Sequence, residues 1–276
     1  MNNFNEKYGP WALVTGASSG IGEQFARQLA AKGMNLVLVA RRQQRLERLS
    51  EELRDAAGID IRTVRLDLTI WDFIQQIREA TADIDVGLVV NNAGALVMGR
   101  FLESSIDDEI SQIDLNVRAP MIIAHEFAPR LARRGRGGMI FVASTLAYQG
   151  TPLAANYAAT KAHVLSFAEG LAHEMQPLGV DILALSPGLT VTEMTRDIDT
   201  STLPMKPMRV EPVVSQAIAD LGRRWSTIPG FTNRLMAVLG RRLFTRRFNT
   251  RLMGNLFAKM KSLTQTQGTP AVAVRA

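Results

Sequence analysis

The sequence feature that most constrains the fold is a glycine-rich turn between a short apolar run and an amphipathic stretch. Residues 15–22 read Thr-Gly-Ala-Ser-Ser-Gly-Ile-Gly. Gly16 permits a tight turn, and Gly20 and Gly22 let backbone N–H groups at the positive end of a helix approach an anionic group. Glycines after a strand often form only a turn, but a strand before and a helix after them favour a dinucleotide-binding unit.

Short aliphatic runs alternate with longer segments of helical periodicity along the chain, which predicts parallel strands joined by crossover helices. The predicted strands are 11–15, 35–40, 61–66, 87–91, 138–143 and 181–186, with a short seventh strand at 225–228. The predicted helices are 21–32, 43–57, 70–80, 106–134 with a break near Pro120, 157–176 and 212–223. We therefore expect an α/β fold with a doubly wound, Rossmann-like parallel sheet.

Composition excludes several function classes. The chain has 276 residues, 46% of them hydrophobic, and none of its apolar runs reaches the roughly 20 residues that span a bilayer. It has no cysteine, so disulfides and thiolate chemistry are excluded, and its three histidines (His125, His163 and His173) lie apart without metal-ligand spacing. We expect a cytoplasmic protein without a metal site.

Residues that carry chemistry follow the glycine loop in a fixed order. They are Asp67 and Leu68 after the third strand, Asn91-Asn92-Ala93-Gly94 after the fourth, Asn116 in the next helix, Ser144 at the end of the fifth strand, Tyr157-Ala-Ala-Thr-Lys161, and the segment from Pro187-Gly188 through Thr190 to Thr192. From about residue 10 to 230 this set resembles the short-chain dehydrogenase/reductase family, in the form that uses NADP(H).

The resemblance implies an oxidoreductase that moves a hydride between a nicotinamide and a carbonyl or alcohol carbon. It implies four catalytic residues: Asn116, Ser144, Tyr157 and Lys161. Asn116 would hold a water that links Lys161 to solvent, and Asp67 would help to hold the adenine. The candidate cofactor-binding residues are Gly16, Ser18, Gly20, Ile21, Gly22, Arg41, Arg42, Asp67, Leu68, Asn92, Ala93, Gly94, Tyr157, Lys161, Pro187, Gly188, Thr190 and Thr192.

The spacing of Tyr157 and Lys161 agrees with that chemistry. Residues four apart on a helix share one face, so the lysine ammonium can stabilise a tyrosine phenolate. A free tyrosine has a pKa of roughly 10, and a nearby positive charge lowers it toward the range useful for proton transfer. We therefore expect Lys161 to lower the pKa of Tyr157, and Ser144 to hydrogen-bond the substrate oxygen.

The second predicted strand indicates which nicotinamide is used. An acidic residue there would accept hydrogen bonds from the adenosine ribose of NAD and repel a 2′-phosphate. This chain has Ala40-Arg41-Arg42 instead. A guanidinium pairs with phosphate through parallel hydrogen bonds, which favours NADP(H) with Arg41 as the main ligand and Ser18 or Arg42 assisting. Arg42 also fits a solvated face of the next helix, an alternative that suits Arg41 less well.

The substrate site is expected from three segments, 95–98, 146–153 and 189–208. Their large apolar residues are Leu96, Val97, Met98, Leu146, Tyr148, Leu153, Leu189 and Met194. They favour a hydrophobic ketone, aldehyde or β-ketoacyl substrate, although the same residues would serve equally to pack a lid.

The last part of the chain differs from the rest in charge. Residues 221–276 contain 11 of the 32 Lys and Arg residues and no Asp or Glu, so the net charge of +6 belongs to this segment and predicts no general nucleic-acid surface. Apolar residues recur every three or four positions over 231–263, with arginines on the remaining face. This predicts a basic amphipathic extension that packs over the substrate site or a second subunit. Peripheral attachment to an anionic membrane is the alternative.

We thus expect an NADP-binding catalytic domain over 1–230 and a C-terminal amphipathic extension over 231–276 whose end, 264–276, is disordered. We also expect a homo-oligomer. Two other readings stay open: an NAD-dependent alcohol dehydrogenase of the same fold, and a nucleotide-binding scaffold without catalytic activity. The intact Ser144, Tyr157 and Lys161 argue against the scaffold.

Overall fold

Seven parallel strands form the central sheet of the computed structural model, which describes residues 3–196, 206–265 and 273–275. Their order is β3-β2-β1-β4-β6-β7-β8. The strands are β1 (Trp11–Thr15), β2 (Asn35–Ala40), β3 (Ile61–Arg65), β4 (Val86–Asn91), β6 (Gly137–Val142), β7 (Val180–Leu185) and β8 (Ser226–Thr227). The chain reverses direction across the sheet between β1 and β4, which creates a crevice at their carboxyl ends. The predicted doubly wound fold is confirmed.

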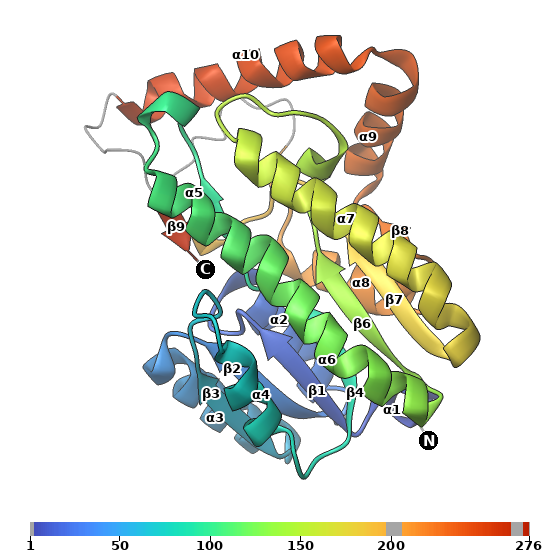
Figure 1. Ribbon diagram of the computed structural model, residues 1–276. Helices are drawn as coiled ribbons and strands as arrows, with labels where there is room; N and C mark the ends of the chain where they lie inside the picture. The colour runs from blue at the N-terminus through green and yellow to red at the C-terminus, as the bar shows by residue number, and fades with distance from the viewer. Residues whose placement is uncertain (1–2, 197–205, 266–272, 276) are drawn as a thin grey trace.

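Helices cover both faces of the sheet, which explains why its strands are aliphatic on both sides. In β1, Val14 packs with the helices of one face and Leu13 with those of the other. One face carries α2 (Gly20–Ala30), α3 (Gln43–Ala57) and α8 (Val210–Asp220). The other carries α4 (Phe73–Ala80), α6 (Ala119–Arg134) and α7 (Ala155–Met175), of which α6 and α7 lie in front in Figure 1.

The predicted break near Pro120 is wrong. The chain stays helical from α5 (Ile106–Ile113) through a π-helical turn, η2 (Asp114–Arg118), into α6. Pro120 is the second residue of α6, which directly follows the π-helical turn. The irregularity therefore lies at the π-helical turn that contains Asn116. Such turns are often found at functional sites.

Several short elements were not expected from periodicity. Helix α1 (Asn3–Tyr8) precedes β1, and its Tyr8 hydroxyl donates to Asp181 Oδ2 at 2.5 Å. Strand β5 (Ala95–Val97) pairs antiparallel with β9 (Ala273–Arg275), close to the C-terminus. Among the described residues, the 3₁₀ turns are η1 (Phe101–Glu103), η3 (Thr145–Tyr148), η4 (Gln176–Leu178) and η5 (Glu193–Thr195).

The C-terminal segment forms two helices, α9 (Phe231–Leu243) and α10 (Arg246–Gln265). Figure 1 shows α10 lying across one end of the molecule, with α9 leading up to it. Of the end predicted to be disordered, residues 264–265 complete α10 and 273–275 form β9, whereas 266–272 and 276 lie outside the described residues. Within the described ranges, no helix combines the length and apolarity needed to cross a bilayer.

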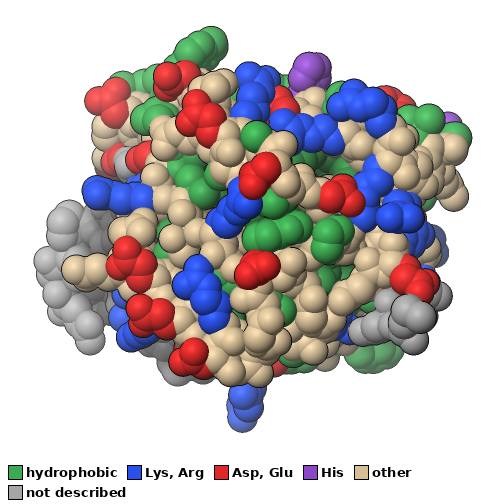
Figure 2. Space-filling view, turned by 90° about the horizontal axis from the view of Figure 1, so that it is seen from below, with side chains coloured by type: hydrophobic (Ala, Val, Ile, Leu, Met, Phe, Trp, Pro, Cys, Tyr) green, Lys and Arg blue, Asp and Glu red, His purple; other side chains and the backbone are tan. Residues whose placement is uncertain are grey.

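Charge is mixed on the face opposite α10. Figure 2 shows this face, where Lys and Arg side chains alternate with Asp and Glu rather than gathering into one patch. Ion pairs join Arg62 of β3 with Asp83, and Arg134 of α6 with Asp85, in the loop before β4. This view gives no sign of a continuous basic surface.

Candidate active site

The glycine loop between β1 and α2 is packed so tightly that Gly16 and Gly22 leave no room for side chains of their own. Gly16 and Gly20 have φ angles of +65° and +57°, which residues with a Cβ rarely adopt. A Cβ on Gly22 would lie 2.2 Å from the carbonyl oxygen of Gly16. The loop therefore brings bare backbone to the carboxyl end of β1.

The N-terminus of α2 suits an anionic ligand. Ser19 is the N-cap residue but makes no side-chain capping bond, and its hydroxyl accepts instead from Arg42 Nη2 at 2.7 Å. The first N–H groups of a helix have no partner within the helix, so a phosphate can accept from them. The glycine loop and this uncapped helix end thus fit the pyrophosphate of a dinucleotide.

A threonine joins this loop to the end of β4. The Thr15 hydroxyl accepts from the backbone N–H groups of Asn92 at 3.0 Å and Ala93 at 3.1 Å. The Asn92 side chain donates back to the Thr15 carbonyl at 2.9 Å. Both amide atoms of the Asn91 side chain are buried without a hydrogen-bond partner within the described part of the chain. The glycine loop and the Asn-Asn-Ala-Gly segment therefore lie together, as the sequence predicted.

Ser144, Tyr157 and Lys161 also come together at this edge of the sheet. Helix α7 places Tyr157 and Lys161 one turn apart, with the lysine Nζ 5.7 Å from the tyrosine ring centroid. Lys161 Nζ donates to the carbonyl oxygen of Val142 at the end of β6, at 2.8 Å. Ser144 follows this strand, and its hydroxyl accepts from the Leu146 N–H at 3.1 Å.

The pKa values differ from the sequence-based expectation. Burial raises the pKa of Tyr157 to about 12, against a smaller lowering by its hydrogen bond with Ser144. Burial also lowers the pKa of Lys161 to about 8. The expected lowering of the Tyr157 pKa by Lys161 is not seen, because burial dominates and the ammonium is directed to Val142. Tyr157 is thus a neutral proton donor at neutral pH.

Asn116 is held by the protein itself. Its Oδ1 accepts from the Ala95 N–H at 2.8 Å, and its Nδ2 donates to the Ala95 carbonyl at 2.9 Å and to Thr160 Oγ1 at 3.0 Å. A Cβ on Gly94 would lie 3.2 Å from Asn116 Oδ1 and 3.4 Å from Lys161 Nζ. Asn116 therefore lies beside the lysine, and its side chain joins β5 to α7.

The two arginines after β2 differ in their hydrogen-bond partners. Arg41 is half-buried and forms no hydrogen bond or ion pair within the described part of the chain. Arg42 donates through Nε to Ser18 Oγ at 3.1 Å and through Nη1 to Glu193 Oε2 at 2.6 Å. Both guanidinium groups lie just after the carboxyl end of β2. Arg41 can offer its N–H groups to an anion directly, whereas the N–H groups of Arg42 already donate to Ser18 and Glu193.

The remaining candidate residues border the same crevice. Asp67 accepts from the N–H and hydroxyl of Thr69, at 2.9 and 2.7 Å, and Leu68 is buried. Thr190 donates to the carbonyl of Gly188 at 2.9 Å. A Cβ on Gly20 would lie 3.2 Å from Thr192 Cγ2, so this threonine covers the glycine loop.

Apolar side chains cover Tyr157. The buried cluster consists of Leu96, Ala154, Tyr157 and Phe257, with Met98, Leu146, Leu153, Met194, Met253 and Leu256 packed against it. Five of these had been expected to line a substrate site. Residues 197–205 of the predicted lining lie outside the described residues.

The sequence predicted that the C-terminal extension packs over the substrate site or a second subunit, but it did not identify which side chains do so. Met253, Leu256 and Phe257 of α10 belong to the cluster over Tyr157. Asn233 of α9 contacts Gly188, where a Cβ would lie 2.6 Å from Asn233 Nδ2. The apolar spacing in α10 was visible in the sequence, but no local signal identified which of its faces turns inward.

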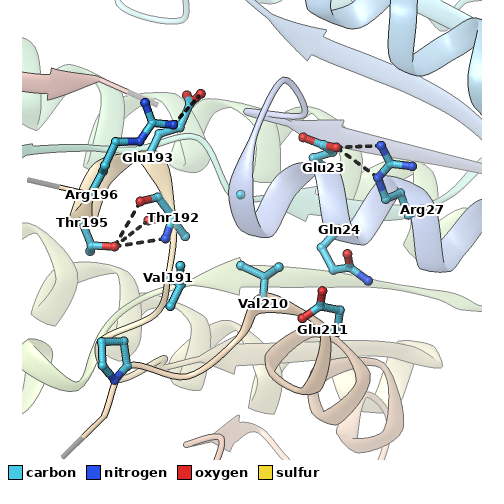
Figure 3. Close-up of a pocket in the computed structure, with 12 residues that line it drawn as sticks. Glu23, Gln24, Arg27, Val191, Thr192, Glu193, Thr195, Arg196, Val210 and Glu211 are labelled. Carbon is cyan, nitrogen blue, oxygen red and sulfur yellow. Dashed lines mark hydrogen bonds and ion pairs between the residues drawn. The ribbon is translucent and has the colours of Figure 1, made fainter.

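A cleft of about 680 Å³ opens between α2 and the segment after β7 (Figure 3). Gly20 and Glu23 line one side, Thr192 and Glu193 the other, and Glu211 of α8 lies at its base. Tyr157 is not part of its lining. The cleft therefore borders the predicted cofactor site rather than the reaction centre. Among the described residues, no group of three or more His, Asp or Glu is placed to hold a metal ion.

This geometry defines a class of protein. A glycine loop, an uncapped helix end and a buried tyrosine beside a lysine, at one edge of a doubly wound sheet, are those of a dinucleotide-dependent oxidoreductase. Residues 10–202 match the family model described as short chain dehydrogenase. The chain belongs to the short-chain dehydrogenase family, whose members interconvert carbonyl and alcohol groups.

Individual relatives agree with this assignment. A 7β-hydroxysteroid dehydrogenase from Clostridium sardiniense is 32% identical over 235 residues, covering 84% of this chain and 90% of that protein. A solved 7β-hydroxysteroid dehydrogenase structure matches with a TM-score of 0.84 at 29% identity, over 91% of this chain and 99% of the other. A short-chain dehydrogenase from Sphingobium yanoikuyae in complex with NADPH matches with a TM-score of 0.76 at 34% identity, over 85% and 93%.

Proposed function

We propose that this protein reduces a hydrophobic ketone with NADPH. The observation that carries the proposal is the apolar cover over Tyr157, in which Leu96, Ala154 and Phe257 of α10 form one buried cluster with the tyrosine. An apolar enclosure with few polar groups near the reacting atoms selects a hydrophobic substrate and positions it through those few groups.

The bound nicotinamide supplies the hydride in this reaction. The chain's own residues handle the oxygen: Ser144 holds it by a hydrogen bond, and the Tyr157 hydroxyl donates a proton to it. Because burial raises the pKa of Tyr157 to about 12, its hydroxyl keeps its proton throughout the neutral range and can donate it to the substrate oxygen. The Lys161 ammonium lies close enough to stabilise the phenolate that remains.

NADP(H) preference rests on the carboxyl end of β2. Ala40 offers no carboxylate to the ribose, and Arg41 is a half-buried guanidinium without an ion-pair partner among the described residues. Arg42 and Ser18 are already joined to each other and lie beside it. The similarity to a structure in complex with NADPH supports the same preference.

The substrate class follows from the cover and from the relatives. Hydroxysteroid dehydrogenases among them point to a bulky ring ketone. A very-long-chain 3-oxoacyl-CoA reductase from Podospora anserina, 34% identical over 202 residues, points to a long-chain β-ketoacyl group. Both are hydrophobic carbonyl compounds, and we propose the ring ketone first.

NADPH oxidation by the purified protein, measured against ring ketones, long-chain β-ketoacyl thioesters and short polar ketones, tests this function. We expect turnover of the hydrophobic compounds and little with the polar ones. Faster NADH-linked alcohol oxidation would support the NAD-dependent alternative. Tight NADPH binding without turnover of any carbonyl would support the scaffold.

We also propose that the protein forms a homo-oligomer and that α10 serves as a cover. Ile106, Ile110 and Ile113 of α5 are exposed, which suits contact with a second copy. The outer side of α9 and α10 exposes apolar residues next to arginines, with Phe248 and Leu252 among them. Membrane attachment through this outer side is the lesser alternative, and salt-sensitive sedimentation with anionic vesicles tests it.

A further inference from the structure

Glu193 links the segment that covers the glycine loop to the arginines after β2. Its Oε2 accepts from Arg42 Nη1 at 2.6 Å, and its Oε1 forms a hydrogen-bonded ion pair with Arg45. Glu193 is the first residue of η5, and the preceding Thr192 covers Gly20. One carboxylate thus ties the η5 segment to α3 across 148 and 151 positions of sequence.

Arg42 has little capacity left for a further anion. Its Nε and Nη2 donate to Ser18 Oγ, Nη2 also donates to Ser19 Oγ, and Nη1 donates to Glu193. A phosphate that pairs with this guanidinium through two hydrogen bonds must take over donors that now serve other acceptors. Glu193 is the acceptor whose negative charge would repel that phosphate.

We infer that Glu193 is a cofactor-specificity residue, an internal anion that competes with the 2′-phosphate of NADP(H) for Arg42. The inference rests on the proposed NADP(H) preference. A nucleotide with the 2′-phosphate displaces the carboxylate from Arg42, so that the η5 segment is joined to α3 through Arg45 alone. A nucleotide without it leaves the pair between Arg42 and Glu193 in place.

Two features of the site support the competition. The Glu193 side chain is only 26% exposed and forms ion pairs with three guanidinium groups, those of Arg42, Arg45 and Arg196, so it remains an anion: the hydrogen bond from Arg42 contributes most to lowering its pKa to about 2. Removing one anion from a shared guanidinium favours the other, since like charges this close repel each other.

The test is calorimetric titration of the full chain with adenosine 2′,5′-bisphosphate and with adenosine 5′-monophosphate. Glu193→Gln should bind the bisphosphate roughly tenfold more tightly than wild type, a usual size for coupling between two groups. Its affinity for the monophosphate should stay the same. Glu211→Gln is the matched control, because Glu211 lines the same cleft and pairs with Arg209 but does not contact Arg42.

Backbone hydrogen exchange over 192–196 gives a second readout. Bisphosphate should speed exchange there in wild type, and the segment should already exchange faster in Glu193→Gln. If wild type prefers the bisphosphate but the variant keeps the same ratio of affinities, the role of Glu193 is refuted while the NADP(H) proposal stands. If neither protein prefers the bisphosphate, both are refuted. A preference that appears only in Glu193→Gln would confirm the competition.

Discussion

The glycine loop and the cover over Tyr157 are built in opposite ways. The loop is packed so tightly around its glycines that a Cβ on Gly22 would meet the Gly16 carbonyl oxygen at 2.2 Å and the Asn92 side chain at 2.4 Å. The cover is made of flexible or bulky side chains, such as Met194 and Phe257, from segments far apart in sequence. The glycine positions of the loop leave no room for larger residues, whereas the cover is made of side chains that can each be replaced.

Because of this difference, we expect substitutions in the two regions to have different effects. Backbone positions cannot be adjusted one atom at a time, so changes in the loop act on the cofactor in an all-or-none way. Side chains of the cover can be shortened individually, and each change should alter substrate affinity by the contact it removes. Tyr157 lies where the two regions meet. Its substitution should therefore change neither cofactor affinity nor substrate affinity first, but the rate of the chemical step.

The largest expected effect is at this meeting point. Tyr157→Phe removes the hydroxyl that donates the proton and keeps the ring that packs against Phe257. We expect turnover to fall by about two to four orders of magnitude, the usual contribution of a general acid. Single-turnover kinetics and NADPH titration measure it, and the dissociation constant for NADPH should be unchanged. A variant that retains most of its turnover would remove Tyr157 from the chemistry.

Next in size is the glycine loop. Gly22→Ala forces a methyl group against a backbone carbonyl, with a cost of about 1–3 kcal/mol from overpacking. We expect NADPH affinity to fall by roughly tenfold or more, with the melting temperature lowered. Gly170→Ala is the control, since a Cβ there meets nothing within 4 Å and lies inside α7. Equal behaviour of the two variants would contradict a loop built on close backbone contact.

The cover should give a smaller and more selective effect. Phe257→Ala removes a buried ring from the cluster over Tyr157, and we expect the KM for a hydrophobic ketone to rise roughly tenfold, from about 1.5 kcal/mol of lost contact. NADPH affinity should stay within twofold. Phe248→Ala changes an exposed ring on the same helix and should leave KM as it is. If Phe257→Ala weakened NADPH instead, the separation of the two regions would be wrong.

The smallest expected effect is on pH dependence. Because the pKa of Lys161 is lowered to about 8, its ammonium loses the proton as pH rises through that value, whereas Tyr157 with a pKa near 12 stays protonated. The rate of ketone reduction should therefore be highest below pH 8 and fall by about half at pH 8. Lys161→Met should be slow and show no step there, and a wild-type rate that rises through pH 8 would contradict the assignment.

Local spacing predicted the sheet and the parts of the site that the backbone makes. The glycine loop, Asn92 to Gly94, and the pair Tyr157 and Lys161 each follow a strand or share a helix, so their meeting at one edge needs only the topology. That the C-terminal extension packs over the substrate site was one of the predicted arrangements. Which of its side chains do so could not be predicted, because Phe257 lies 100 positions from Tyr157 in sequence and no local signal sets that register.

Charges and burial were less accessible from sequence. The pair between Arg42 and Glu193 spans 151 positions and was not foreseen. The direction of the Tyr157 pKa shift was wrong because it depends on burial, which spacing does not report. The π-helical turn at Asn116 was placed near Pro120, since proline is visible in a sequence and a shifted hydrogen-bond pattern is not.

Hydride transfer itself tests the central claim most directly. The measurement uses NADPH deuterated at the transferable position, a ring ketone as substrate, and mass spectrometry of the alcohol formed by wild type and by Tyr157→Phe. We predict one deuterium on the carbinol carbon of the wild-type product and almost no product from the variant. Ketone consumed without label in the alcohol, or the same labelled yield from both proteins, would contradict NADPH-dependent reduction through Tyr157.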